Sequence, residues 1–352
     1  MESQKNDLVS NRIEVLAQSI KDMLYKSAQS IAAVNSNLQL LALNAKIQAA
    51  KVGSVGAGFS VVASEIRSLS ARTQAITSEM EKDAEVKISE LMHLNTILET
   101  QVRGKRLSQV ARNCIDIIDR NLYERSCDVR WWATESAVVE ATLNPTSINI
   151  SRASERLAKI LESYTVYYDI VLCNQQGEVI CNGRPAKYHC IGAQAASYKW
   201  FKQAMDSKDG SEYGFEGPFT GSLAGNQEVL VYSCGVRAND SQGRSIGVLG
   251  VVFNWVGLSQ EVLKSAEEVL RSETVHSLSA YICSNAGEVY SATTKFEKNH
   301  HVVSDVKKLL SQQDLFLIEQ QGSNRRKLIG AAPSLGYETY KTGWVSIIIE
   351  SQ

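Results

Sequence analysis

Apolar and small residues recur at steps of three and four through the first fifty residues, which is the spacing of one helix face. We call this set, together with its continuation after residue 58, the seam. Before residue 50 its members are Ile13, Leu16, Ile20, Met23, Ser27, Ile31, Val34, Leu38, Leu41, Ala45 and Gln48. After residue 58 they are Val62, Ile66, Leu69, Thr73, Ile76 and Met80, and then, with one break in phase, Ile88, Leu91, Leu98 and Val102. This alternation predicts two long helices that pack in a coiled coil.

Three glycines separate the two helical stretches: Gly53, Gly56 and Gly58 are the only glycines in the first 103 residues. Glycine readily adopts the positive φ that ends one helix and reverses the chain, so this cluster predicts the tip of an antiparallel hairpin. Each arm has roughly 45 residues, or about 68 Å of helix. Because the seam is rich in Ala and Ser, one hairpin buries little apolar surface. We therefore expect a homodimer in which two hairpins form a four-helix bundle.

The chain beyond Gly104 starts with helical patterns. Residues 105–143 read as one long helix that continues the second arm, with Gly104 as the only interruption. Pro145 ends this helix, and residues 148–163 form a further amphipathic helix.

From residue 165 the periodicity changes to that of strands, and it does so twice. The segment LCNQQGEVI at residues 172–180 aligns with ICSNAGEVY at residues 282–290. Helices are expected at residues 198–205 and 301–312, β-hairpins at residues 229–255 and 328–350, and a connecting helix at residues 258–273. The order β-β-α-β-β-β is that of a PAS-like antiparallel sheet with a helical face. The fold class is therefore α+β, with domains at residues 1–104, 105–257 and 258–352.

Composition narrows the function classes. The chain has 37 Lys and Arg residues against 38 Asp and Glu residues and no basic tract, which disfavours a nucleic acid partner. No apolar run approaches the roughly 20 residues of a membrane span, so we expect a cytoplasmic protein. The seven cysteines lack the spacing of a disulfide framework. Cys181, His189 and Cys190 are the nearest approach to a metal site, but no paired ligand spacing accompanies them, so we expect no metal, cofactor or enzymatic activity.

The hairpin tip resembles a known family. The string LLALNAKIQAAKVGSVGAGFSVVASEIRSL at residues 40–69 is similar, without a gap, to the signalling tip of bacterial methyl-accepting chemotaxis receptors. This resemblance implies a dimeric four-helix bundle, trimers of dimers, and binding of a histidine kinase and its coupling adaptor at the tip. The positions that the resemblance assigns to partner contacts are Asn44, Gln48, Lys51, Phe59, Glu65 and Arg67.

The tip departs from the family pattern at three charged positions. Gln48 and Ser54 each stand where the family has Glu, and Ala57 stands where it has Arg. The first hypothesis is a signal transducer that senses a small molecule and signals through the tip to the kinase. The alternative is a ligand-responsive oligomerisation or adaptor protein that no longer couples to a kinase. A coiled coil that only dimerises the protein is the third interpretation.

Residues 105–352 resemble a double Cache sensor domain, in which a long helix leads into two PAS-like modules. The strings that carry this resemblance are NLYERSCDVRWWATES, YKWFKQAM, SIGVLGVVFNW and GYETYKTGW. Because the hairpin precedes the sensor and no membrane span separates them, the chain looks like a soluble receptor with reversed domain order.

The resemblance places a ligand pocket in the first module. The candidate ligand-binding residues are Trp132, Tyr198, Trp200, Tyr213, Phe219, Tyr232 and Asn254. Aromatic residues at these positions are also suited to core packing, and Arg125 and Arg130 fit a role in fixing the long helix to the sheet. In amino-acid sensors of this type, an Arg and an Asp hold the charged groups of the ligand. Tyr198 and Val252 occupy those two positions here, so we expect an uncharged ligand rather than an α-amino acid.

Overall fold

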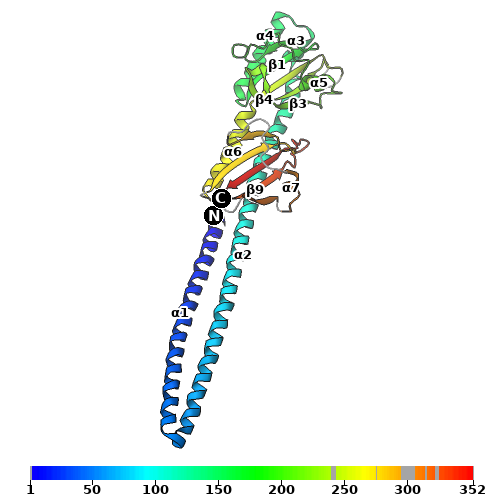
Figure 1. Ribbon diagram of the computed structural model, residues 1–352. Helices are drawn as coiled ribbons and strands as arrows, with labels where there is room; N and C mark the ends of the chain where they lie inside the picture. The colour runs from blue at the N-terminus through cyan, green and yellow to red at the C-terminus, as the bar shows by residue number, and fades with distance from the viewer. Residues whose placement is uncertain are drawn as a thin grey trace. The chain divides into compact units, whose positions relative to one another are not determined.

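The chain begins with a helical hairpin and continues into a unit with two antiparallel sheets, as the computed structural model shows (Figure 1). The structure describes residues 2–238, 243–274, 276–294, 306–313, 315–321 and 325–351. Backbone contacts divide the chain into two units, Met1–Arg103 and Gly104–Gln352. We call them the hairpin unit and the C-terminal unit and describe each by itself.

The hairpin unit has the turn that the glycines predict. Helix α1 spans Glu2–Lys51, a short 3-10 helix spans Gly53–Gly56, and helix α2 starts at Ala57. Gly53 has a φ of +65°, which an L side chain rarely adopts. At Gly56, an added Cβ would lie 2.2 Å from the carbonyl oxygen of Ala49. Glycine is therefore required at both positions, and the predicted hairpin is confirmed.

Small residues form the contact between the two arms. In α1 they follow one another every seventh position, and the same interval separates Gly56, at the end of the 3-10 helix, from Ala63 and Ser70 of α2. The buried residues of α1 in this contact are Ala28, Asn35, Ala42 and Ala49. Short side chains let the two helices approach closely, but they bury little apolar area.

The large residues of the seam stay exposed in the single chain. Leu38 is 39% exposed, Leu41 is 63% exposed, and Leu69 is 61% exposed. Other seam residues with more than a third of their surface exposed are Leu16, Ile20, Met23, Val34, Val62, Ile76, Met80, Leu91, Leu98 and Val102. This agrees with the expectation that one hairpin leaves its seam without a partner.

Helix α2 spans Ala57–Trp132 without a break, so the expected interruption at Gly104 is wrong. Gly104 instead lets the ring of Phe316 pack closely against α2, because an added Cβ at Gly104 would lie 2.3 Å from that ring. The predicted single helix at residues 105–143 is also wrong. After Trp132 the chain turns, and α3 spans Ser136–Leu143. Thr134 marks the turn: its amide and its hydroxyl both donate to the carbonyl of Trp131, at 3.1 and 2.7 Å.

Helix α4, Ser147–Ser163, follows α3 and has the expected amphipathic pattern. Its N-terminus is capped by Thr146, whose hydroxyl accepts from the amide of Asn149. Leu157 and Leu161 are buried on its inner face. None of the helices in the described part of the chain is both long and apolar enough to cross a bilayer.

The first sheet has the strand order β2-β1-β5-β4-β3, all antiparallel. The strands are β1 Tyr167–Asn174, β2 Val179–Asn182, β3 Gly214–Gly221, β4 Gln227–Val236 and β5 Gly247–Phe253. Helix α5, Lys199–Met205, lies between β2 and β3 in sequence and covers one face of the sheet. The predicted β-β-α-β-β-β order is confirmed for this sheet.

The second sheet repeats the first, with the order β7-β6-β10-β9-β8. The strands are β6 Ser277–Cys283, β7 Val289–Ala292, β8 Phe316–Gln321, β9 Arg325–Pro333 and β10 Val345–Ser351. Helix α7 spans Val306–Leu310, and residues 301–305 of the expected helix lie outside the described residues. Helix α6, Trp255–Arg271, connects the sheets and contains the expected domain boundary after residue 257.

The first sheet has a different apolar cluster on each face. Side chains of α2, α3 and α4 pack on one face, against residues such as Ile170, Leu172 and Tyr232; we call this the helix face. On the other face, residues of α5 pack against Val171, Val231 and others; we call this the α5 face. Alternation along the strands thus turns neighbouring side chains of one strand to opposite faces of the sheet.

Candidate functional site

The α5 face of the first sheet gathers three of the predicted ligand-binding residues: Tyr198, Trp200 and Phe219. The ring of Trp200 is stacked on that of Tyr198 with centroids 6.2 Å apart, and Phe219 lies 5.8 Å from Tyr198. Trp200 is fully buried, whereas Tyr198 is half-buried and hydrogen-bonded to Ser222. The aromatic set therefore extends from the core to the surface.

Backbone contacts hold Trp200 in place. Its amide donates to Glu216 at 3.1 Å, and its carbonyl accepts from the hydroxyl of Ser233 at 2.7 Å. The indole ring lies over Gly250, where an added Cβ would come within 3.1 Å of it. The indole Nε1 is buried and has no hydrogen-bond partner. A buried donor without a partner is energetically unfavourable.

A buried carboxylate lies on the same sheet. Asp169 of β1 is fully buried and lies opposite Val252 of β5. Its oxygens accept from the side-chain amide of Asn182 at 2.6 Å and from the backbone amides of Ile170 and Arg184. Burial raises the pKa of Asp169 to about 6, although these hydrogen bonds act in the opposite direction. Both oxygens are thus engaged within the protein.

The other four predicted ligand-binding residues do not lie with Tyr198, Trp200 and Phe219 on the α5 face. Trp132 and Tyr232 belong to the core on the helix face, and Tyr213 packs against Tyr232 there. Asn254 caps α6 by accepting from the amide of Gly257 at 2.9 Å. The structure therefore does not bring all seven residues together. Strand alternation turns Tyr232 to the helix face, Trp132 lies at the end of α2, and Asn254 is at the start of α6.

The basic residues near Trp132 have packing partners on α2 and the sheet. Arg125 lies over the rings of Tyr167 and Phe253, at 5.3 and 5.8 Å from their centroids. Arg130 lies 5.8 Å from the centroid of Tyr213. These contacts fit the interpretation that both arginines fix α2 to the sheet. Trp131, next to the buried Trp132, is 66% exposed, as a rotation of about 100° per helical residue requires.

The cysteines of the C-terminal unit have the environment of packing residues. All seven thiols of the chain are free, and six of them are buried. Burial raises the pKa of Cys181 and of Cys190 to about 12, which keeps both thiols protonated. Within the described ranges, no group of three or more His, Cys, Asp or Glu side chains is arranged to hold a metal ion.

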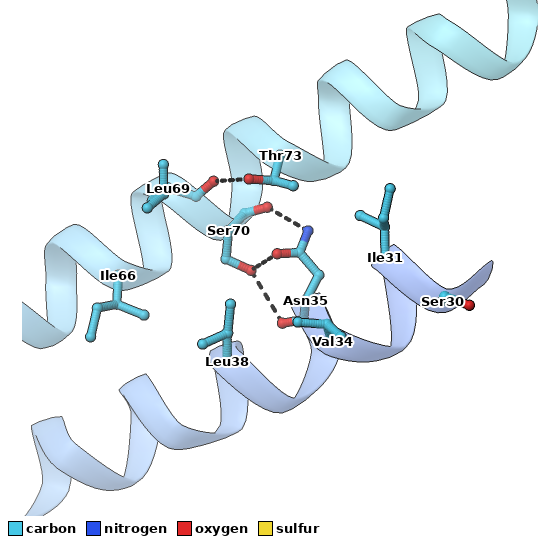
Figure 2. Close-up of a pocket in the computed structure, with 9 residues that line it drawn as sticks. All are labelled: Ser30, Ile31, Val34, Asn35, Leu38, Ile66, Leu69, Ser70 and Thr73. Atoms are coloured by element: carbon cyan, nitrogen blue, oxygen red, sulfur yellow. Dashed lines mark hydrogen bonds between the residues drawn. The ribbon is translucent and has the colours of Figure 1, made fainter. Parts of the chain in front are cut away.

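A groove runs between the two arms of the hairpin unit (Figure 2). Its volume is about 420 Å³, and six of its nine lining residues are seam residues from both helices. The lining residues are Ser30, Ile31, Val34, Asn35, Leu38, Ile66, Leu69, Ser70 and Thr73. The groove is thus an apolar surface to which both arms contribute.

A polar pair forms the floor of this groove. The side-chain amide of Asn35 donates to the carbonyl of Ser70 at 2.8 Å. The hydroxyl of Ser70 lies 2.8 Å from Oδ1 of Asn35 and 3.2 Å from its carbonyl oxygen. Both residues are 2% exposed. Because these bonds form only when the two residues are opposite each other, they fix the register of the arms.

The six residues predicted to contact partners all lie on the surface near the hairpin turn. Asn44, Gln48 and Lys51 are exposed on α1, and Glu65 and Arg67 are exposed on α2. Phe59, on the first turn of α2, is 72% exposed. Val52 and Val55 are also exposed, so the tip carries several exposed apolar side chains.

Three residues with clear structural roles were missed by the sequence reasoning. Asp169 interrupts the apolar run YYDIVL, and a charged residue within such a run indicates a buried carboxylate with a specific role. Asn35 and Asp119 each replace an apolar residue on a helix face, but their partners are far away in sequence, at Ser70 and beyond Pro333. Nothing local in the sequence indicates those partners.

Comparison with known proteins gives matches for both parts of the chain. Residues 2–161 match the family model of the methyl-accepting chemotaxis protein (MCP) signalling domain. The methyl-accepting chemotaxis protein PcaY of Pseudomonas putida is 31% identical over 161 residues, which are 42% of this chain and 29% of that protein. McpQ of the same species is 54% identical over 52 residues, 15% of this chain and 8% of McpQ. The chain thus spans less than a third of these relatives.

The C-terminal unit is similar in fold to solved sensor domains. The ligand-binding domain of Campylobacter jejuni chemoreceptor Tlp3, in complex with 4-methylisoleucine, superposes with a TM-score of 0.53 at 16% identity, covering 72% of this chain and 92% of that domain. The sensor domain of the Vibrio cholerae histidine kinase DctB gives a TM-score of 0.52 at 12% identity, covering 72% of this chain and 98% of that domain. Residues 2–161 therefore match the methyl-accepting chemotaxis protein signalling domain, and the C-terminal unit has the fold of these two sensor domains.

Proposed function

We propose that the chain is a signal transducer that senses a small molecule through its first sheet and signals from the hairpin tip to a histidine kinase and its coupling adaptor. The observation that carries this proposal is the presence, in one chain, of a chemoreceptor-type hairpin with an exposed seam and a sensor fold. In this function ligand binding shifts a population of hairpin packings, and no reaction is catalysed.

The α5 face of the first sheet supports an uncharged ligand with an aromatic or other planar group. Tyr198 and Trp200 present aromatic surface, and the indole N–H of Trp200 has no partner within the protein. Neither Tyr198 nor Val252 carries a charge, and the carboxylate of Asp169 is engaged by Asn182 and two backbone amides. Burial of a zwitterion against these groups would leave its charges unpaired.

A thermal-shift screen of the intact chain against metabolites tests the sensing function. Uncharged planar compounds with a hydrogen-bond acceptor should raise the melting temperature, because ligand binding to the folded state stabilises it by mass action. Free α-amino acids should give no appreciable shift. A clear shift with an α-amino acid, and none with any planar compound, would contradict this assignment of the pocket.

Kinase coupling should depend on charge at the tip. Gln48 and Ala57 are exposed and replace a Glu and an Arg of the family pattern. We expect the double variant Gln48→Glu, Ala57→Arg to co-sediment with a chemotaxis kinase and its adaptor more strongly than the wild type. An exposed pair contributes only about 0.2 to 1 kcal/mol, so the gain should be a few-fold at most per contact.

The matched control reverses the charge at an exposed position on α2 away from the tip, for example Lys87→Glu, whose partner Glu90 is also exposed. This variant should leave co-sedimentation unchanged. If neither the wild type nor the restored variant binds the kinase, the second function is favoured. That function is a ligand-responsive oligomerisation or adaptor protein, and the three charge losses at Gln48, Ser54 and Ala57 are what support it.

A further inference from the structure

The segment at residues 334–344, between β9 and β10, makes its strongest polar contacts with helix α2 rather than with its own sheet. We call it the latch segment. Asp119 of α2 is 1% exposed and accepts four hydrogen bonds from it. One oxygen accepts from the hydroxyl of Ser334 at 2.6 Å and from the amide of Gly336 at 3.1 Å. The other accepts from the hydroxyl and the amide of Thr342, at 2.6 and 3.3 Å.

Bonds within the latch segment keep it compact. The backbones of Tyr337 and Tyr340 exchange two hydrogen bonds, at 2.8 and 2.9 Å. Gly336 has a φ of +91°, and an added Cβ there would lie 2.7 Å from the carbonyl oxygen of Tyr340. The segment is therefore a tight turn with one conformation set by glycine and by the Asp119 carboxylate.

Helix α2 also holds the latch segment through aromatic contacts. The ring of Tyr337 packs edge-on against Tyr123, with centroids 5.4 Å apart, and the guanidinium of Arg120 lies 5.0 Å from the centroid of Tyr337. Asp119, Arg120 and Tyr123 follow one another along one turn of α2. The segment thus contacts α2 at three neighbouring side chains.

The opposite side of the latch segment reaches the first sheet. Tyr340 is 6% exposed, and its hydroxyl lies 2.5 Å from the hydroxyl of Tyr232 on β4. The ring of Tyr213 is stacked on Tyr340 with centroids 6.4 Å apart. Tyr340, from the loop between β9 and β10, therefore packs in the core on the helix face of the first sheet.

Strand β4 connects this contact with the candidate ligand site. Tyr232 points to the helix face, whereas its neighbours Val231 and Ser233 belong to the α5 face. The hydroxyl of Ser233 donates to the carbonyl of Trp200. Strand β4 therefore joins the Trp200 contact on the α5 face to the Tyr232–Tyr340 contact on the helix face.

We propose that the latch segment couples the first sheet to helix α2, so that a displacement of β4 is passed through Tyr232 and Tyr340 to Asp119. The coupling is a property of the folded C-terminal unit and does not depend on the identity of the ligand. It makes Asp119, Tyr340 and Thr342 positioning residues that act on α2 through packing and hydrogen bonds.

Hydrogen–deuterium exchange of the intact chain tests the coupling. In Asp119→Asn, exchange should become faster in residues 334–344 and also in β4, which Asp119 does not contact. The expected increase is about two- to tenfold, the effect of losing one or two net hydrogen bonds. Reciprocally, Tyr232→Phe should speed exchange in residues 112–125 of α2. Asp116→Asn, at an exposed carboxylate one turn earlier on α2, should change neither region.

Faster exchange confined to residues 334–344 in Asp119→Asn, with β4 unchanged, would overturn the proposal, because the segment would then be only a local loop anchor. If Asp119→Asn does not fold, Thr342→Val provides the same test, since it removes one hydroxyl and leaves the carboxylate with its other donors. Equal exchange in β4 for Thr342→Val and the wild type would likewise contradict the coupling.

Discussion

Replacement of Trp200 by alanine should lower the free energy of unfolding by about 3 to 5 kcal/mol, the range for removing a fully buried large aromatic side chain. Trp200 is 0% exposed and packs over Gly250 and against Tyr198 and Phe201. Alanine would leave a cavity beneath α5 that the strands can close only in part. Urea unfolding followed by circular dichroism measures the difference.

Trp131→Ala is the matched control, since it removes the same side chain from a position that is 66% exposed. Its effect should stay within about 0.5 kcal/mol. Trp200→Phe keeps most of the packing and tests the ligand role separately. Once a ligand is known, this variant should bind it with an affinity lower by roughly 1 to 3 kcal/mol, because the indole N–H and part of the stacking surface are lost. Equal affinity in the wild type and in a folded Trp200→Phe would show that the ligand does not contact the indole.

Charges placed in the groove should separate the hairpins. Leu38 and Leu69 line the groove from opposite arms and are 39% and 61% exposed in the single chain. In a four-helix bundle the double variant Leu38→Glu, Leu69→Glu would bring four carboxylates into the apolar contact, where unpaired charges are strongly disfavoured. We expect the dimer dissociation constant to rise by at least about a hundredfold, equivalent to roughly 3 kcal/mol. Sedimentation velocity over a concentration series measures it.

The control for this experiment places the same charges outside the seam. Leu40 and Val86 are 57% and 63% exposed, one on each arm, and neither lines the groove. Leu40→Glu, Val86→Glu should therefore associate as the wild type does. Similar dissociation in both double variants would mean that charge repulsion in general, and not burial of the seam, governs the association.

The sequence predicted the hairpin and both sheets because their signals are local. Glycines required by the turn at residues 53 and 56 and strand alternation each depend on residues close together in the chain, and the internal repeat appears when two segments of the sequence are aligned. The end of α2 at Trp132 was missed because no glycine or proline lies there. The turn depends on Thr134 and on packing of Trp132, which a one-dimensional pattern does not contain.

The candidate site was only partly predictable for the same reason. Residue type identified Trp200 and Tyr232 as aromatic candidates, but strand alternation turns Tyr232 to the helix face, whereas Trp200 belongs to α5 on the other side of the first sheet. Asp119 has its hydrogen-bond donors more than 200 residues further along the chain, so no spacing rule could connect them. Partners that are distant in sequence become visible only in the folded structure.

The mass of the intact chain in solution tests most directly whether the exposed seam is buried by a second hairpin. Sedimentation equilibrium at tens of micromolar should give a mass of at least twice the 38.7 kDa of one chain. The mass should fall towards that of the monomer in Leu38→Glu, Leu69→Glu. A wild-type mass of 38.7 kDa across this concentration range would contradict the four-helix bundle, and with it the proposed route from the sensor fold to the signalling tip.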